Sequence, residues 1–398
     1  MTEFYLDNSA TTPLCEAAIA KMTDVMQNAY GNPSSLHSLG LRAEKIMSEA
    51  RMQILSALVP TRSGIRPKAE NLIFTGSGTE ANNLAIIGGA TAKPRNKGKK
   101  IIIGETEHPS VLEAAKHLEA LGYRVARIPS PKGVWDMDAY RAALDENVIL
   151  VSAMLVNNET GAVNDIAAIA KAARAKNPDV LVHCDDVQGF LKVPVSPIPH
   201  ADMVTVSAHK IGGPKGVGAL YVNDRVLKTK AIVPVVYGGG QERGLRSGTE
   251  NVIGIAGFGA AAQAGAKHFA SLHEGFTALR QRLKASLAEF PEDAVRINEP
   301  ESAVTAPHIV SLTAFRLRSE TLLHSLSASG VYVSSGSACS SNGGGSHTGY
   351  VLKSFGLPDA EADSTIRISF GEQTTEKDID ALSAALRESV ERLAHKRR

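Results

Sequence analysis

The stretch DMVTVSAHKIGGPKG, residues 202–216, joins an apolar run to a glycine-rich turn. The β-branched residues of its first half predict a buried strand, and Lys210 stands where that strand ends. In open α/β folds this edge of the sheet is where ligands bind. A lysine amine at that edge is placed to form a Schiff base with a carbonyl cofactor. The alternative is a solvated lysine in an ordinary turn.

Length and composition limit the classes of protein to which the chain can belong. Its 398 residues exceed what one small core needs and predict two domains. The formal net charge of +2 gives no reason to expect nucleic acid or an anionic membrane as the main partner. No apolar run is long enough to span a bilayer, and the first residues resemble neither a secretion signal nor a transit peptide.

The three cysteines, Cys15, Cys184 and Cys339, are widely separated along the chain. They form neither a disulfide framework nor a zinc-spaced cluster, so we expect no metal site. Together with the absence of a targeting segment, this cysteine usage favours a reducing compartment, and we expect a cytoplasmic protein.

Short apolar runs alternate with helical patterns from residue 71 to residue 222. The runs do not alternate polar with apolar residues, which is typical of strands buried on both faces. The pattern therefore predicts a large α/β domain with three layers around a mostly parallel sheet. The expected strands are 72–75, 101–104, 124–128, 148–155, 180–183, 203–206 and 219–222, with helices at 79–91, 111–121 and 165–175.

The rhythm changes after a long Ala-rich helical stretch at 249–286. Spaced strands and two helices then predict a smaller α+β unit. We place the large domain at 15–257, and the small domain at 1–14 together with 258–398. The expected elements of the small domain are strands at 295–297, 308–312, 331–333 and 366–370, and helices at 320–328 and 376–393.

A glycine turn, FTGSGTEANN at residues 74–83, follows one predicted strand and opens a helix. Backbone amides at Gly78 and Thr79, helped by the Thr79 hydroxyl and the helix dipole, would bind a phosphate. The segment matches neither the dinucleotide fingerprint nor the P-loop, so the single phosphate of a small cofactor fits better. The alternative is a plain turn with a capping residue.

Another predicted strand ends in VHCDDVQ, residues 182–188. A carboxylate at Asp185 is costly to bury unless it is paired with a cation or hydrogen-bonded. The protonated pyridine nitrogen of pyridoxal phosphate is such a partner, and this pairing makes that cofactor an electron sink. Strand alternation puts His183 on the same face as Asp185 and turns Cys184 toward the core.

Further polar residues stand at strand ends and in one long loop. His108 in ETEHPS could stack on a planar ring and move protons, or be an ordinary loop histidine. Asn158 could donate to a phenolic or carboxylate oxygen, or simply form a turn. In the glycine-rich segment 237–251, Arg246 and Thr249 could bind a phosphate or brace another subunit.

The segment VSSGSACSSNGGGSH, residues 333–347, has the composition of an exposed, mobile loop. A thiol there, at Cys339, is suited to attack in one place and delivery in another; the alternative is a chance surface cysteine. Farther along, Arg367 lies inside an apolar run. Its partner is expected to be an anion, either a substrate carboxylate or a structural ion pair.

In this order, the segments resemble the cysteine desulfurases of the NifS/IscS type, which belong to the class V aminotransferase-like group of fold-type I pyridoxal phosphate enzymes. The resemblance runs from Tyr5 to Gly371. One departure is the order Thr-Gly-Ser-Gly-Thr-Glu at 75–80, where the family usually reads Thr-Ser-Gly-Gly-Thr-Glu. The segments that carry the resemblance are 74–83, 107–109, 157–159, 207–210, 239–249 and 336–341.

The resemblance implies a role for each matching residue. Lys210 would be the Schiff-base lysine, with His108 stacked on the ring. Asp185 would pair with the ring nitrogen, and Gln188 with the ring hydroxyl oxygen. The residues that would hold the phosphate are Gly78, Thr79, Ser207 and His209, with Thr249 reaching in from the other subunit of a homodimer. The residues expected around the substrate are Asn158, which would also border the cofactor, Arg367, and Asn8 and His37 in N-terminal loops.

The implied reaction removes sulfur from L-cysteine and gives L-alanine. Lys210 would move the α-proton, His108 would accept a proton, and the Cys339 thiolate would attack the substrate sulfur to form a persulfide. An acceptor protein, such as an iron–sulfur cluster scaffold, would then receive the sulfur. A selenocysteine lyase, another β-lyase of this fold and a catalytically silent scaffold protein remain alternatives.

Overall fold

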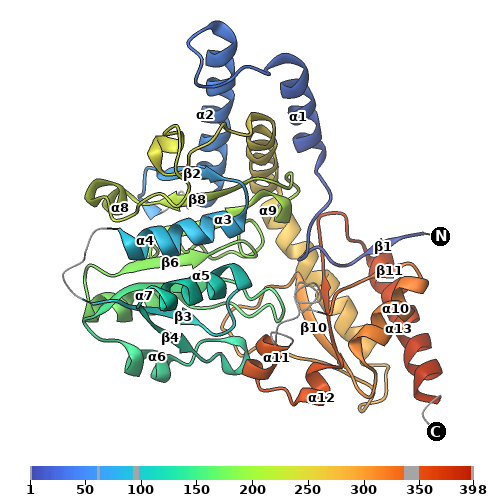
Figure 1. The fold of residues 1–398 in the computed structure, drawn as a ribbon. Helices are drawn as coiled ribbons and strands as arrows, with labels where there is room; N and C mark the ends of the chain where they lie inside the picture. Colours follow the sequence, from blue (N-terminus) through green and yellow to red (C-terminus); the bar gives the residue numbers. More distant parts are fainter. Residues whose placement is uncertain (1, 61–62, 93–97, 336–348, 396–398) are drawn as a thin grey trace.

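The computed structural model describes residues 2–60, 63–92, 98–335 and 349–395. Its largest sheet has seven strands in the order β2-β8-β7-β6-β5-β3-β4 (Figure 1). These strands are β2 (Leu72–Thr75), β3 (Lys100–Gly104), β4 (Arg124–Ile128), β5 (Val148–Met154), β6 (Leu181–Asp185), β7 (Met203–Ser207) and β8 (Gly218–Val222).

The directions of the strands bring several strand ends to one edge. The pairs β3–β4, β3–β5, β5–β6 and β6–β7 are parallel. Strand β8 is antiparallel to both of its neighbours, β2 and β7. The carboxyl ends of β3, β5, β6 and β7 therefore share an edge, which is where open α/β sheets place their ligands.

Helices cover both faces of this sheet and complete three layers (Figure 1). One apolar cluster joins the sheet to α1 (Glu16–Asn28), α2 (Ser38–Leu58), α6 (Met137–Ala143), α7 (Ile166–Lys176) and the first part of α9 (Val252–Leu287). The other joins the opposite face to α3 (Gly78–Asn83), the π-helical turn η3 (Leu84–Gly88), α4 (Gly89–Thr91), α5 (Pro109–Ala120) and α8 (Asp224–Thr229). Short 3₁₀ turns are η2 (Ala69–Asn71), η4 (Pro131–Gly133), η5 (Ala208–Lys210) and η6 (Glu242–Gly244).

A third apolar cluster surrounds a three-stranded antiparallel sheet in the order β12-β10-β9. Beside it, β1 pairs in parallel with β11, so the N-terminal segment lies against the C-terminal third of the chain (Figure 1). The N-terminal segment and the chain after α9 contain the remaining elements: β1 (Phe4–Tyr5), β9 (Val295–Ile297), β10 (Ile309–Ala314), α10 (Ser319–Ala328), β11 (Val331–Tyr332), α11 (Tyr350–Phe355), α12 (Asp359–Ala362), β12 (Thr365–Ser369) and α13 (Glu376–His395).

The predicted α/β fold with a mostly parallel sheet is confirmed, and each predicted strand has a counterpart. Strand β6 ends at Asp185, two residues later than predicted, so the carboxylate is part of the strand end itself. The short helices α6 and α8 were not predicted, since few residues give a weak periodic signal. Because the cores of the two units meet along α9, we propose the domain division given above, with its boundary in α9 near residue 258.

Within the described ranges, no helix combines the length and the apolar character that crossing a membrane requires.

Candidate active site

Three of the predicted site residues lie just beyond or at the ends of neighbouring parallel strands. His108 follows β3, Asp185 is the last residue of β6, and Lys210 ends the 3₁₀ turn η5 that follows β7. Strand β5 lies between β3 and β6, and β6 pairs directly with β7. Because these strands run the same way, the structure brings the three side chains to one edge of the sheet.

A hydrogen-bonded chain joins Asp185 to His108. Asn82 Nδ2 donates to Asp185 Oδ2 at 2.7 Å and to Ser110 Oγ at 2.8 Å. Ser110 Oγ in turn lies 2.8 Å from His108 Nδ1. Asp185 also accepts from the Val187 amide at 3.0 Å, yet it forms no ion pair with any described residue although it is only 6% exposed. A buried carboxylate in this state has room for a cationic partner.

Sequence reasoning missed the two connecting residues, Asn82 and Ser110. Asn82 lies in the glycine-turn segment, three residues after Thr79 and so about one helical turn farther along. Ser110 follows the Pro109 that opens α5. Both belong to segments that were already singled out, but the sequence does not show that their side chains meet between two strand ends.

His108 is held as a neutral ring. It caps the N-terminus of α5, where the Ser110 amide donates to His108 Nδ1 at 3.1 Å. Burial lowers the pKa of His108, Lys210 lowers it further, and Asp185 acts in the opposite direction. With Nδ1 acting as an acceptor, the neutral ring carries its proton on Nε2.

Lys210 and Gln188 both contact the N-terminal loop. The Lys210 ammonium donates to the carbonyl oxygens of Ser9 and Ala10 at 2.6 and 2.7 Å. Gln188 Nε2 donates to the same Ser9 oxygen at 2.9 Å. Asn8 pins this loop to β12, since its Nδ2 donates to the Ser369 carbonyl at 3.0 Å. Asn8 therefore has a structural role, and the loop lies against the strand ends.

The glycine turn forms a narrow cradle at the start of α3. A Cβ atom on Gly78 would lie 3.2 Å from Val187 Cγ2 and 3.3 Å from Ser207 Cβ, so a larger residue would crowd both neighbours. Thr79 is exposed beside it, and Ser207 ends β7. The structure thus brings together three of the residues that were predicted to hold a phosphate, Gly78, Thr79 and Ser207, with backbone amides of a helix N-terminus among them.

His209, the fourth predicted phosphate residue, points to the N-terminal loop. Its Nδ1 lies 3.2 Å from Thr11 Oγ1. Burial and the nearby Lys210 lower the pKa of His209 to about 4. The ring is therefore neutral at pH 7 and would interact with a phosphate as a hydrogen-bond donor rather than as a cation.

The segment before α9 is tied to the glycine turn of its own chain. Arg246 Nε donates to Glu80 Oε1 at 2.8 Å, and Glu80 Oε2 accepts from the Gly76 amide at 2.8 Å. Thr249 is exposed and lines a small hollow with Gly76. Arg246 therefore braces the turn within one chain.

Arg367 in β12 has one of the two partners that the sequence left open, the structural ion pair. Its Nη2 forms an ion pair with Asp7 Oδ1 at 2.8 Å, and its Nη1 donates to the Asn158 carbonyl at 3.0 Å. Among the described residues, Arg367 Nε has no hydrogen-bond partner although it is buried. The structural ion pair is therefore present, and an N–H group is left over for an additional anion.

The model for the family described as aminotransferase class-V matches residues 4–382. This chain belongs to the class-V aminotransferase family. A protein of Aeromonas salmonicida named cysteine desulfurase IscS is 39% identical over 98% of this chain and 93% of its own length. A cysteine desulfurase of a Nostoc species is 38% identical over 99% of this chain and 94% of its own length.

Solved structures agree with the family assignment. A structure described as a NifS-like protein has a TM-score of 0.87 and 32% sequence identity, and the match covers 99% of this chain and 100% of the other. A structure of SspA in complex with cysteine has a TM-score of 0.76 and 30% identity, covering 93% of this chain and 99% of the other. This member of the class-V family thus shares a whole-chain fold with NifS-like proteins.

The predicted site residue His37 caps a helix of this class-V family member and forms no hydrogen bond with the strand-end residues described above. His37 is exposed and caps α2, since its Nδ1 accepts from the Gly40 amide at 3.3 Å. Cys339 lies outside the described residues. Beyond that segment, the Tyr350 hydroxyl donates to the Glu107 carbonyl at 2.7 Å, which joins the start of α11 to the turn that carries His108.

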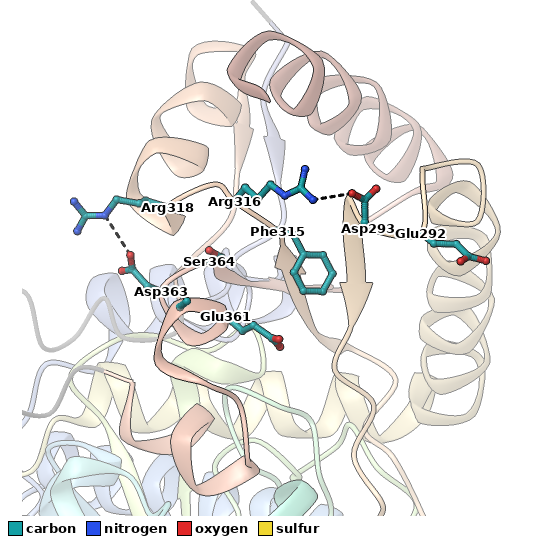
Figure 2. Close-up of a pocket in the computed structure, with 9 residues that line it drawn as sticks. Glu292, Asp293, Phe315, Arg316, Arg318, Glu361, Asp363 and Ser364 are labelled. Atoms are coloured by element: carbon teal, nitrogen blue, oxygen red, sulfur yellow. Dashed lines mark hydrogen bonds and ion pairs between the residues drawn. The ribbon is translucent and has the colours of Figure 1, made fainter. Parts of the chain in front are cut away.

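A separate surface hollow of about 530 Å³ lies on the small α+β unit (Figure 2). Four of its six charged side chains pair with one another: Arg316 with Asp293 at 3.0 Å, and Arg318 with Asp363 at 3.2 Å. None of the residues predicted to carry chemistry lines it. The strand-end cluster therefore remains the candidate active site of this class-V family member.

Proposed function

We propose that this protein is a pyridoxal phosphate-dependent cysteine desulfurase, which removes sulfur from L-cysteine and releases L-alanine. The observation that carries the proposal is the buried Asp185–Asn82–Ser110–His108 network beside Lys210. The names of the relatives, cysteine desulfurases at 36–39% identity, support the choice of substrate. So does the similar structure of SspA in complex with cysteine.

The residues present fit the cofactor. Asp185 is a buried carboxylate without an ion pair among the described residues, which suits a protonated ring nitrogen. Gly78 forms a cradle that a Cβ atom would fill, which suits a phosphate next to the amides that begin α3. Bound pyridoxal phosphate would supply an electron sink for a carbanion at the substrate Cα.

The chain's own residues divide the remaining work. Arg367 would bind the substrate carboxylate through its unpaired Nε–H, with Asn158 beside it. Lys210 would take the proton from the substrate Cα and return one to the product. His108 would accept the proton of the substrate thiol at Nδ1, the ring nitrogen that carries no proton, because its lowered pKa keeps the ring uncharged at pH 7.

The Cys339 thiolate would attack the substrate and receive its sulfur. The Cys339 sulfur would form a bond to the substrate sulfur. The substrate Cβ–S bond would break, and its electron pair would remain with Cβ. Protonation there gives alanine, so L-cysteine and the Cys339 thiol become L-alanine and a Cys339 persulfide. A sulfur-acceptor protein, such as an iron–sulfur cluster scaffold, would take the sulfur from this persulfide.

The proposal includes a homodimer in a reducing, cytoplasmic environment. Thr249 is exposed in the single chain, and the Arg246–Glu80 pair holds its segment in place, which supports a contact of Thr249 with the partner's phosphate group. The apolar side chains of Tyr30, Leu36 and Tyr237 are 76%, 93% and 80% exposed, and a second copy would cover such residues.

The test is to incubate the purified protein and pyridoxal phosphate with L-cysteine. Alanine should form, and mass spectrometry of the peptide with Cys339 should show the mass of one added sulfur. Cys339→Ala should abolish sulfur transfer while the protein still binds the cofactor. Sulfide release at the full rate by Cys339→Ala would favour another β-lyase, and turnover of selenocysteine but not cysteine would favour a selenocysteine lyase.

The remaining alternative is a catalytically silent scaffold protein. A purified protein that gains no visible absorbance from added pyridoxal phosphate would favour this function over catalysis. The complete set of Lys210, Asp185, His108 and Cys339 in the sequence argues against it.

A further inference from the structure

A buried lysine lies behind the candidate active site. Lys192, in the turn that follows β6, is only 6% exposed, and no described acidic residue forms an ion pair with it. Its ammonium group donates to Gln188 Oε1 at 3.3 Å. Burying an ammonium group is costly, so a lysine kept in such a place calls for a physical reason.

The contact determines which way the Gln188 amide points. An ammonium group only donates hydrogen bonds, so the atom of Gln188 that faces Lys192 is the acceptor Oε1. The amide nitrogen is therefore turned the other way, where one of its N–H groups donates to the Ser9 carbonyl at 2.9 Å. The second N–H group of Nε2 is available to an acceptor on the same side, next to Lys210.

We propose that Lys192 is a positioning residue that acts through Gln188: by binding Oε1, it holds the Gln188 amide with its N–H group toward the ring hydroxyl oxygen of the bound cofactor. The inference rests on the proposed function, because it takes pyridoxal phosphate as the ligand. A donor at that oxygen stabilises its negative charge and weakens its hold on a neighbouring proton. Lys192 thus influences the pH at which the bound cofactor loses a proton and its visible absorbance changes.

The surroundings of Lys192 make this contact sensitive to pH. Burial, then Lys210 and then Arg367 lower the pKa of Lys192 to about 7, whereas Asp186 opposes the shift. From the other elements packed around it, the ring of His308 and the His273 ring, whose Nδ1 lies 3.1 Å from the Lys192 carbonyl, also face this lysine. Lys192 and Lys210 border the same cavity, of about 60 Å³.

Two substitutions separate orientation from charge. Lys192→Met removes both the donor and the charge, whereas Lys192→Gln removes the charge but keeps an N–H donor that can reach Gln188. Exposed Lys215, on the glycine turn after η5, gives the matched control Lys215→Met. Each protein is loaded with pyridoxal phosphate, and the visible absorbance of the bound cofactor is titrated with pH, without substrate. Thermal melting of each loaded protein verifies that the variant is folded.

Lys192→Met should move the midpoint of the titration to higher pH by about one unit. Lys192→Gln keeps an N–H donor, so its midpoint should lie close to that of the unsubstituted protein. Lys215→Met should leave the midpoint unchanged. In a Gln188→Met background, Lys192→Met should cause no additional shift, because the residue through which Lys192 acts is gone.

The opposite results overturn the inference. Equal shifts in Lys192→Met and Lys192→Gln, or a full additional shift in the Gln188→Met background, would show that the charge acts directly. An unchanged midpoint in Lys192→Met would show that the lysine only packs the turn. If the unsubstituted protein gains no visible absorbance with pyridoxal phosphate, the proposed function fails first and the role of Lys192 fails with it, whereas a normal spectrum with a failed Lys192 test leaves the proposed function intact.

Discussion

The two sides of the candidate site are assembled in different ways. On one side, His108, Asp185 and Lys210 come from the ends of neighbouring parallel strands of one sheet. On the other side, Arg367 of β12 is held by Asp7, which lies 360 residues away in the sequence. We call these the strand-end side and the docked side.

The difference predicts a division of labour. The strand-end side is connected within the large sheet through Asn82 and Ser110, so it requires only that this sheet forms. The docked side requires the N-terminal segment to pair with β11 and to bridge to Ser369 at the end of β12. We therefore expect substitutions on the strand-end side to change cofactor binding and chemistry, and those on the docked side to change substrate binding.

The largest effect is expected for Lys210→Ala on the strand-end side. Removing the group that moves the substrate α-proton should lower kcat by about 10²–10⁴-fold. Alanine formation at saturating cysteine and cofactor measures it. Lys215→Ala, at an exposed lysine five residues farther along, is the control and should keep full activity. Equal rates in the two variants would remove Lys210 from the chemistry.

A second test concerns stability beneath the strand-end side. His183 is fully buried between Ser152 and Thr205, and burial lowers its pKa from the usual 6.5 to about 4. The unfolded chain therefore binds a proton that the folded chain does not between pH 6.5 and 4. Stability is fully present above pH 6.5 and falls by about 3 kcal/mol as the pH drops through this window.

Denaturant unfolding at pH 6.5 and at pH 4.5 measures this loss. His183→Gln, which keeps polar atoms between the two hydroxyl groups, should make the difference between the two pH values smaller. His117→Gln, at an exposed histidine of α5, should leave it unchanged. If His183→Gln loses the same free energy of unfolding between pH 6.5 and pH 4.5 as the unsubstituted protein, groups other than His183 cause the loss.

On the docked side, Arg367→Lys should raise the KM for cysteine by up to about 10²-fold, the effect of losing a hydrogen bond to a charged group. The affinity for pyridoxal phosphate should not change, because the cofactor contacts lie on the other side. Arg318→Lys, in the exposed Arg318–Asp363 pair of Figure 2, is the control and should alter neither quantity. A loss of cofactor affinity with an unchanged KM would contradict the division between the two sides.

The smallest effect is expected for Asn82→Ala, which removes the donor shared by Asp185 and Ser110. The dissociation constant for pyridoxal phosphate should rise by about 10-fold, since a hydrogen bond to a carboxylate is lost. Equilibrium titration with the cofactor measures it. Asn83→Ala, whose side chain only bonds the exposed Thr79 carbonyl, is the control. If Asn82→Ala and Asn83→Ala bind the cofactor with equal affinity, the hydrogen bonds of Asn82 do not contribute to cofactor binding.

The strand-end side was accessible from the sequence because its signals are local. An apolar run followed by small or polar residues marks the end of a buried strand, and parallel strands bring their carboxyl ends together. That reasoning placed Lys210, Asp185 and His108 at one edge. The predicted strand 180–183 stopped short of Asp185, since single residues at an element end carry little periodic signal.

The docked side was only partly accessible. An arginine in an apolar run indicated an anionic partner, but the sequence did not choose between a substrate and an ion pair. The structure supplies Asp7 as that partner and leaves Arg367 Nε without one among the described residues. His37 was expected near the pocket, and the structure adds that it caps α2, a role that the sequence did not indicate.

The sequence by itself determined the α/β architecture, the positions of the strand ends and the reactive residue types at them, because apolar periodicity and turn chemistry act over a few residues. Only the tertiary structure decided that Asn82 joins Asp185 to Ser110, that Lys192 orients Gln188 and that the Ser9 carbonyl receives Lys210. Such contacts join residues far apart in the chain or use backbone atoms that every residue carries. They leave no pattern in the sequence and arise only when the sheets and the N-terminal segment pack together.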